Sequence, residues 1–114
     1  MTALEEEVSR LYCEPVIGGG NANPFGEQNI KNLLKKYRDI EGPDMEAMLT
    51  LVKNYSKSGD LASCYVSVGV LHALGMEDDV EDAYQWAQTQ DNPRLYASHF
   101  DIGKSIAEHV AFGG

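Results

Sequence analysis

Residues 62–75 read ASCYVSVGVLHALG, and the predicted fold class depends on whether they form a helix or a strand. In the run from Tyr65 to Leu71, valines stand at alternate positions, so the run is also compatible with a strand. A helix over 61–74 is favoured because apolar and aromatic residues recur there at helical spacing: Leu61, Cys64, Tyr65, Val68, Leu71 and His72. Gly69, in the middle of such a helix, costs about 1 kcal/mol relative to Ala. That cost is usually offset where a second helix lies too close for a larger side chain, so we predict a close helix contact at Gly69.

On both sides of residues 62–75, the sequence predicts helices and no strand. The expected ranges are 3–12, a second helix from Pro24 to the Gly42–Pro43 boundary, 43–57, 61–74, 80–90, and a last helix from Asn92–Pro93 to Phe112. The expected N-terminal caps are Thr2 with Glu5 in a capping box, Asn23, Asp60, and either Asp78 or Asp79.

The length of 114 residues fits one domain over 1–114. Residues 1–23 supply the first helix and a glycine-rich loop through Gly18, Gly19 and Gly20. The linkers after residue 40 are short, and short linkers favour consecutive helices that pack antiparallel as neighbours. The predicted fold class is therefore all-α, with antiparallel helix pairs in a short α-solenoid of about six helices.

The region of about 60–106 resembles a Sel1-like repeat, a relative of the tetratricopeptide repeat. Val68-Gly69 is followed by His72 and Gly75 at the spacing of the family's first helix, and Gly69 and Gly103 are 34 residues apart, within the range of helical-hairpin repeats. The sequence departs from the family pattern at His72, where the family has Tyr, and in a shorter loop after Gly75. The resemblance implies that six residues hold structural positions of the repeat, with Trp86 packing between helices: Gly69, Gly75, Ala83, Trp86, Ala97 and Gly103.

Charge is distributed unevenly. Residues 1–57 carry nine acids and seven bases, whereas residues 58–114 carry nine acids and two bases, a net charge of −7. This balance disfavours nucleic acid, whose phosphates need Lys and Arg, and it suits a basic protein partner. We expect a cytoplasmic protein because the N-terminus lacks the pattern of a secretory signal and no apolar run reaches the length of a membrane span. Cys13 and Cys64 are expected to be free thiols, with a disulfide between them as the alternative.

The candidate chemical motifs are all incomplete. Gly103-Lys104-Ser105 resembles the end of a P-loop, but Ser98 stands where that motif needs its first Gly. The three histidines lack the spacing of metal ligands, and the acidic run of residues 77–82 lacks the alternation of a calcium-binding loop. We therefore expect no metal, no cofactor and no enzymatic activity.

The sequence thus favours a small adaptor or scaffold domain that binds a protein or peptide in a groove between helices. The candidate contact residues, each also compatible with a structural role, are Tyr65, His72, Tyr84, Tyr96, His99, Asp78, Asp79, Glu81 and Asp82. The alternative is an acidic immunity or inhibitor protein that neutralises a basic bacterial or phage-related enzyme. A homodimer is also compatible with the sequence, because a short solenoid leaves its end faces uncovered.

Overall fold

The chain folds around helix α4 (Leu61–Ala73), in which every residue from Cys64 to Leu71 is buried. A helix that is buried on all sides has no polar face, which explains why its sequence was also compatible with a strand. The structure, a computed structural model, describes residues 2–17, 23 and 25–112, and within these ranges it contains six helices and no strand. The predicted all-α fold is confirmed.

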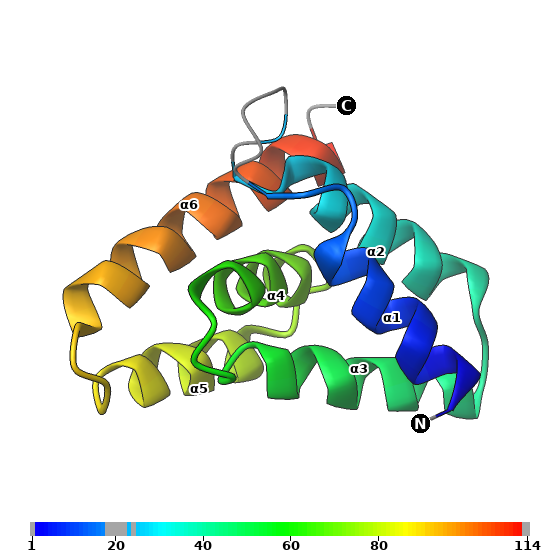
Figure 1. Cartoon of the computed structure of the whole chain (residues 1–114), viewed down its shortest axis with the longest axis horizontal. Helices are drawn as coiled ribbons and strands as arrows, with labels where there is room; N and C mark the ends of the chain where they lie inside the picture. Colours follow the sequence, from blue (N-terminus) through cyan, green and yellow to red (C-terminus); the bar gives the residue numbers. More distant parts are fainter. Residues whose placement is uncertain (1, 18–22, 24, 113–114) are drawn as a thin grey trace.

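Five further helices surround or flank α4 (Figure 1): α1 (Ala3–Cys13), α2 (Glu27–Asp39), α3 (Pro43–Tyr55), α5 (Glu77–Ala87) and α6 (Pro93–Phe112). Helix α4 packs against α2, α3, α5 and α6, and its contact with α6 is by far the most extensive. In Figure 1 it lies between α6 above and α3 and α5 below, while α1 lies on α2 and α3. One cluster of buried hydrophobic side chains joins all six helices.

The contact between α4 and α6 is made at two glycines. A Cβ atom added to Gly69 would lie 2.7 Å from the backbone oxygen of Gly103, and one added to Gly103 would lie 2.3 Å from the backbone oxygen of Tyr65. Tyr65 and Gly69 are four residues apart and share one face of α4, so Gly103 packs against both. The close helix contact predicted at Gly69 is confirmed, and its partner is Gly103.

The N-terminal helix is held by buried polar contacts. The side-chain amide nitrogen of Asn29, on α2, donates hydrogen bonds to the backbone oxygens of Leu11 and Pro15, both at 3.0 Å. Its amide oxygen accepts a hydrogen bond from the Asn23 side chain at 2.9 Å. The Tyr12 hydroxyl shares a 2.6 Å hydrogen bond with Ser67 of α4, and burial raises the pKa of this tyrosine above its ordinary value. These contacts attach α1 and the following segment to α2 and α4.

Most predicted helix ends agree with the structure. Thr2 and Glu5 form the predicted capping box, in which the Thr2 hydroxyl accepts from the Glu5 backbone at 3.1 Å. Asp60 caps α4 as predicted, because its carboxylate accepts from the Ser63 backbone at 3.1 Å. Gly75 adopts φ +77° immediately after α4, with open space around it, so its role is to end the helix.

The start of α2 was predicted too early. The helix begins at Glu27, and Gly26 precedes it with φ +74°. Gly26 also lies so close to α4 that a Cβ atom there would be 2.8 Å from the Val66 side chain. The predicted cap at Asn23 is therefore wrong, because Gly26 holds the cap position; the Asn23 side-chain oxygen nevertheless accepts a hydrogen bond from the Gln28 backbone at 2.9 Å. Pro24 and the predicted loop residues Gly18, Gly19 and Gly20 lie outside the described residues.

The start of α5 was predicted too late, because the helix begins at Glu77. Asp78 and Asp79 therefore lie in its first turn and are not caps, and Met76, at the cap position, makes no side-chain hydrogen bond. Acidic residues in a first turn interact favourably with the positive end of the helix dipole. The prediction failed because aspartate is favoured both at a cap and in the first turn that follows it, so its presence does not distinguish the two positions.

We predict that Gly103→Ala destabilises the protein by about 2 kcal/mol or more, measured as the free energy of unfolding in urea. The added methyl group would collide with backbone atoms of Tyr65, which cannot rotate away, and overpacking of this kind typically costs more than the helix propensity that Ala gains. Ser98→Ala, on an exposed position of the same helix, serves as the control and should change stability by less than about 0.5 kcal/mol. A Gly103→Ala protein as stable as the wild type would contradict the close contact.

We also predict that Asn29→Ala lowers the free energy of unfolding by about 2–3 kcal/mol, since three hydrogen bonds at about 1 kcal/mol each are lost. Asn32→Ala is the matched control on the same helix, where the side chain accepts one exposed hydrogen bond from Gln28. Equal effects of the two substitutions would show that the Asn29 contacts do not secure the N-terminal helix.

Candidate functional site

A groove of about 440 Å³ runs between α5 and α6. Helix α5 lines it with Glu77, Val80, Glu81, Tyr84 and Gln85, and Gln88 lines it from the position directly after the helix. Helix α6 lines it with Asp101 and Lys104. The residues from α5 recur every three or four positions, so they share one helix face, and the groove is the space between that face and α6.

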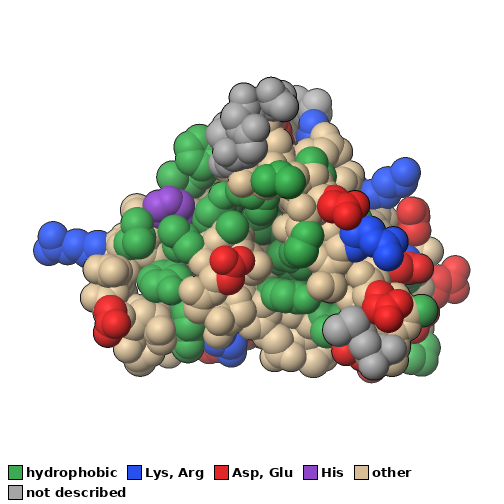
Figure 2. All heavy atoms as spheres, viewed as in Figure 1, with side chains coloured by type: hydrophobic (Ala, Val, Ile, Leu, Met, Phe, Trp, Pro, Cys, Tyr) green, Lys and Arg blue, Asp and Glu red, His purple; other side chains and the backbone are tan. Residues whose placement is uncertain are grey.

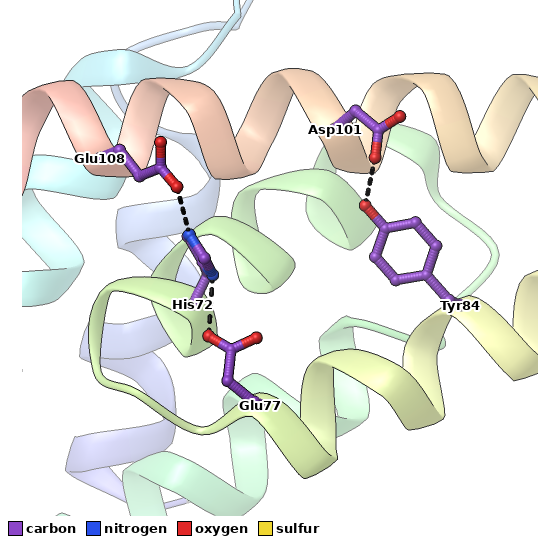
Figure 3. Close-up of polar contacts among 5 residues, drawn as sticks. All are labelled: His72, Glu77, Tyr84, Asp101 and Glu108. Carbon is purple, nitrogen blue, oxygen red and sulfur yellow. Dashed lines mark hydrogen bonds and ion pairs between the residues drawn. The ribbon is translucent and has the colours of Figure 1, made fainter.

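Tyr84 spans the groove. Its hydroxyl donates a hydrogen bond to the Asp101 carboxylate at 2.5 Å (Figure 3), and its ring meets that of Phe100 edge to face, with centroids 5.3 Å apart. Burial raises the pKa of Tyr84, and the hydrogen bond to Asp101 together with the negative charges of Asp101, Glu77 and Glu81 raises it further. The hydroxyl therefore stays protonated and remains a donor at neutral pH.

The ammonium group of Lys104 lies over the same ring, 5.3 Å from its centroid. This distance is within the range of a cation–π interaction. Lys104 is the basic side chain that lines the groove, together with three carboxylates, those of Glu77, Glu81 and Asp101. The groove is therefore negative in sign.

His72, at the end of α4, connects α5 and α6 next to the groove. Its Nδ1 lies 2.9 Å from a carboxylate oxygen of Glu77, and its Nε2 lies 2.8 Å from one of Glu108 (Figure 3). An imidazolium donates both hydrogen bonds at once, whereas a neutral ring has one N–H to donate. The side chain of His72 is 18% exposed, so it is a partly buried link that orients Glu77.

The structure brings only some of the predicted contact residues together. Tyr84 and Glu81 line the groove, and His72 contacts it through Glu77. Asp82 is exposed on α5. Asp78 and Asp79 line a separate hollow of about 250 Å³ beside Gly75, and Asp79 forms an ion pair with Lys53 at 3.5 Å.

The remaining aromatic candidates hold structural positions. Tyr65 is 5% exposed and belongs to the core, with its ring centroid 5.7 Å from that of His99. The ring of His99 is in turn held by a 2.9 Å contact between its Nδ1 and the backbone oxygen of Leu95. Tyr96 packs against Trp86 and donates a hydrogen bond to the Gly59 backbone at 3.1 Å. A structural role was the alternative that the sequence left open for each of them.

The residues expected to be structural occupy different environments. Ala83 is fully buried, Ala97 is partly buried, and Trp86 packs edge to face on Tyr96 with centroids 5.3 Å apart. Gly69 and Gly103 make the close contact between α4 and α6, whereas Gly75 makes no close contact and ends a helix. The small residues of the pattern therefore serve two distinct purposes.

Sequence reasoning missed Asp101 and Lys104, which complete the groove from α6. The two lie three residues apart, on one side of that helix, which was a detectable signal. Their orientation toward α5 depends on how α6 is rotated against α4. That rotation follows from the glycine contact and cannot be read from spacing within α6 alone.

A second hollow of about 420 Å³ lies near the start of α2 and the C-terminal half of α6, lined by Phe25, Glu27, Ile102, Ser105, Ile106 and His109.

In Figure 2, hydrophobic side chains gather over α4 and α6, while acidic and basic side chains are mixed over α1 and α2. One such pair is Glu7 with Lys36, whose hydrogen bond and positive charge hold the pKa of Glu7 below its ordinary value. The charge on this side is balanced, unlike that of the groove.

Cys13 is exposed and Cys64 is buried, and both are free thiols, as the sequence predicted. In the described part of the chain, no group of three or more His, Cys, Asp or Glu side chains is arranged to hold a metal ion. Over those same residues, no helix combines the length and the apolar character needed to cross a bilayer.

Comparison with known proteins gives no family. No protein-family model matches the chain. No curated protein matches its sequence, and no solved structure matches its fold. The resemblance to Sel1-like repeats therefore stays a prediction that rests on the residues quoted above.

We predict that stability falls as the pH rises above about 10, where tyrosines in an unfolded chain lose their protons, because the folded protein retains the protons of Tyr12, Tyr65 and Tyr84. Asp101→Asn removes the negative charge that raises the pKa of Tyr84 and replaces a charged acceptor with a neutral amide oxygen, so the unfolding free energy of this variant should decline less steeply over this range. A tyrosinate absorbance titration of the folded protein should also show one tyrosine ionising at lower pH. Asp82→Asn, on an exposed residue of α5, is the control, and identical titrations of the two variants would contradict the role of Asp101.

Proposed function

We propose that this chain is a small, non-catalytic protein-interaction domain that binds a basic segment of another protein in the groove between α5 and α6. The observation that carries the proposal is the groove itself, where an aromatic ring and three carboxylates line one hollow of about 440 Å³. A groove between two helices is a common place for a peptide to bind, and carboxylates on its walls favour Lys and Arg.

The charge of the whole second half supports a basic partner. Residues 58–114 have a net charge of −7, from nine acids and two bases, and α5 contributes the exposed acids Glu77, Asp78, Glu81 and Asp82. A field of one sign around a groove speeds the encounter with a partner of opposite sign. We therefore expect the association rate to fall as salt is added.

The hydrogen bonds of the groove favour binding over catalysis. The Tyr84 hydroxyl is directed at Asp101, and both ring nitrogens of His72 face carboxylates. Groups that satisfy one another hold the walls of the groove in a defined position and are not directed at a reacting atom. A groove whose walls are held in this way loses little conformational entropy when a ligand binds.

A second function, inhibition of a basic enzyme, is favoured by the concentration of acidic charge in residues 58–114. Acidic inhibitors neutralise basic clefts through charge complementarity. The two functions differ in affinity and selectivity. An inhibitor would bind one basic enzyme tightly and abolish its activity, whereas an interaction domain would bind basic segments from several proteins with moderate affinity.

The test is the affinity for a fluorescein-labelled helical peptide that carries both Lys and Arg, measured by fluorescence anisotropy at low and physiological salt. We expect Glu81→Lys to weaken binding about tenfold, roughly 1.4 kcal/mol, because it reverses a charge on the groove wall. Glu41→Lys makes the same change in net charge at an exposed residue between α2 and α3, so it should weaken binding much less.

Two results would contradict the proposed function. The first is the absence of peptide binding at low salt. The second is an equal loss of affinity in the Glu81→Lys and Glu41→Lys proteins, which would mean that net charge alone attracts the peptide and that the groove is not the binding site.

A further inference from the structure

The groove between α5 and α6 already contains a cation, and the cation comes from the protein itself. The Lys104 side chain extends from α6 so that its ammonium group lies over the ring of Tyr84. It is partly exposed, and the walls of the groove that it lines also carry the carboxylates of Glu81 and Asp101. The face of the Tyr84 ring can therefore accommodate a positively charged side chain.

The environment of Tyr84 strengthens its attraction for a cation. Its hydroxyl donates a 2.5 Å hydrogen bond to the Asp101 carboxylate, visible in Figure 3. Donation to an anion shifts electron density from the O–H bond onto the phenol ring, and cations are attracted to the negative face of an aromatic ring. The edge-to-face contact with Phe100 and the hydrogen bond together fix the ring, so its orientation does not depend on a ligand.

Glu81 provides a second contact point beside the ring, three residues before Tyr84 on the same helix. The contact that the structure gives its carboxylate is a long one, 3.4 Å from the side-chain amide of Gln85. The carboxylate retains the capacity to accept two further hydrogen bonds from a ligand. A ligand group that stacks on an aromatic ring and also donates two parallel hydrogen bonds to a carboxylate is a guanidinium.

We propose that Tyr84 and Glu81 form the binding position for an arginine side chain of the partner, and that Lys104 occupies this position in the free protein. The inference rests on the proposed function and names the chemistry of the partner at that same groove. The guanidinium displaces the ammonium of Lys104 from the ring, stacks in its place and pairs with Glu81. Lys104 then swings into solvent, which its partly exposed position and flexible stem allow.

Displacement has a consequence for affinity. Every arginine that binds must replace an existing cation–π contact, so Lys104 lowers the affinity for the partner. An exposed contact of this kind corresponds to about a two- to fivefold change in a binding constant. Arginine should be preferred over lysine, because a partner lysine would only exchange one ammonium for another on the ring.

The experiment uses the full chain and three labelled helical peptides that are identical except at their basic positions, which carry arginine, lysine or citrulline, the neutral counterpart of arginine. We expect the wild type to bind the arginine peptide more tightly than the lysine peptide, and both more tightly than the citrulline peptide. Lys104→Met keeps a stem of similar length without the charge, and it should bind the arginine peptide about two- to fivefold more tightly than the wild type.

Two further variants separate the ring from general electrostatics. Lys31→Met removes one positive charge at an exposed position of α2, so it measures the effect of net charge alone. Tyr84→Leu removes the ring, and it should lose the preference for arginine over lysine. Tyr84→Phe keeps the ring and removes the hydroxyl, so part of the preference for arginine should remain. This variant keeps the inference testable if the Leu variant is poorly folded and gives no result.

The outcomes distinguish this inference from the function on which it rests. If Glu81→Lys weakens binding much more than Glu41→Lys does, but Lys104→Met gains no more affinity than Lys31→Met, the groove binds a basic peptide and the displacement of Lys104 is wrong. If the lysine and arginine peptides bind the wild type equally, the arginine position is wrong. If none of the three peptides binds at low salt, both the inference and the proposed function are wrong.

Discussion

The structure depends on the approach of two backbones, where Gly103 of α6 meets Gly69 and Tyr65 of α4. No Cβ fits on either glycine, since it would lie 2.3–2.7 Å from a backbone oxygen of the opposite helix. Contact at this distance places many atoms of both helices in van der Waals range, and dispersion forces of small individual size add up along the interface. Helix α4 can then be enclosed by α2, α3, α5 and α6 and become the centre of the core.

The same contact positions the candidate site. An α-helix turns about 100° per residue, so Lys104 points about 100° and Asp101 about 160° away from the direction of Gly103. Because Gly103 faces α4, both of these side chains leave the core and point toward α5, where Tyr84 meets them. The position of the groove is thus a consequence of core packing. Its polar contacts, including those of His72 with Glu77 and Glu108, stabilise the relative position of α5 and α6 that the core packing sets.

Much of the fold was accessible from the sequence because its signals are local. The capping box of Thr2 and Glu5, the cap at Asp60 and the helix break at Gly75 each depend on residues within one turn, and the structure confirms them. Gly69 was identifiable as a contact point because a mid-helix glycine is unfavourable by itself. The identity of its partner helix, the start of α2 after Gly26 and the burial of Asn29 depend on contacts between distant segments, which no local pattern encodes. The site shows the same division, since Tyr84 and Glu81 were candidates from α5 alone, but Asp101 and Lys104 required the rotation of α6.

The two thiols differ in exposure, so their reactions with a thiol reagent can be used to follow unfolding. Cys13, at the exposed end of α1, is open to reagents in the native protein, whereas Cys64 lies within the fully enclosed part of α4. A thiol-modifying reagent therefore reacts rapidly with Cys13, whereas it reacts with Cys64 only after the helices around α4 separate. The slow step of such a labelling reaction measures how often the core opens, with no engineered probe.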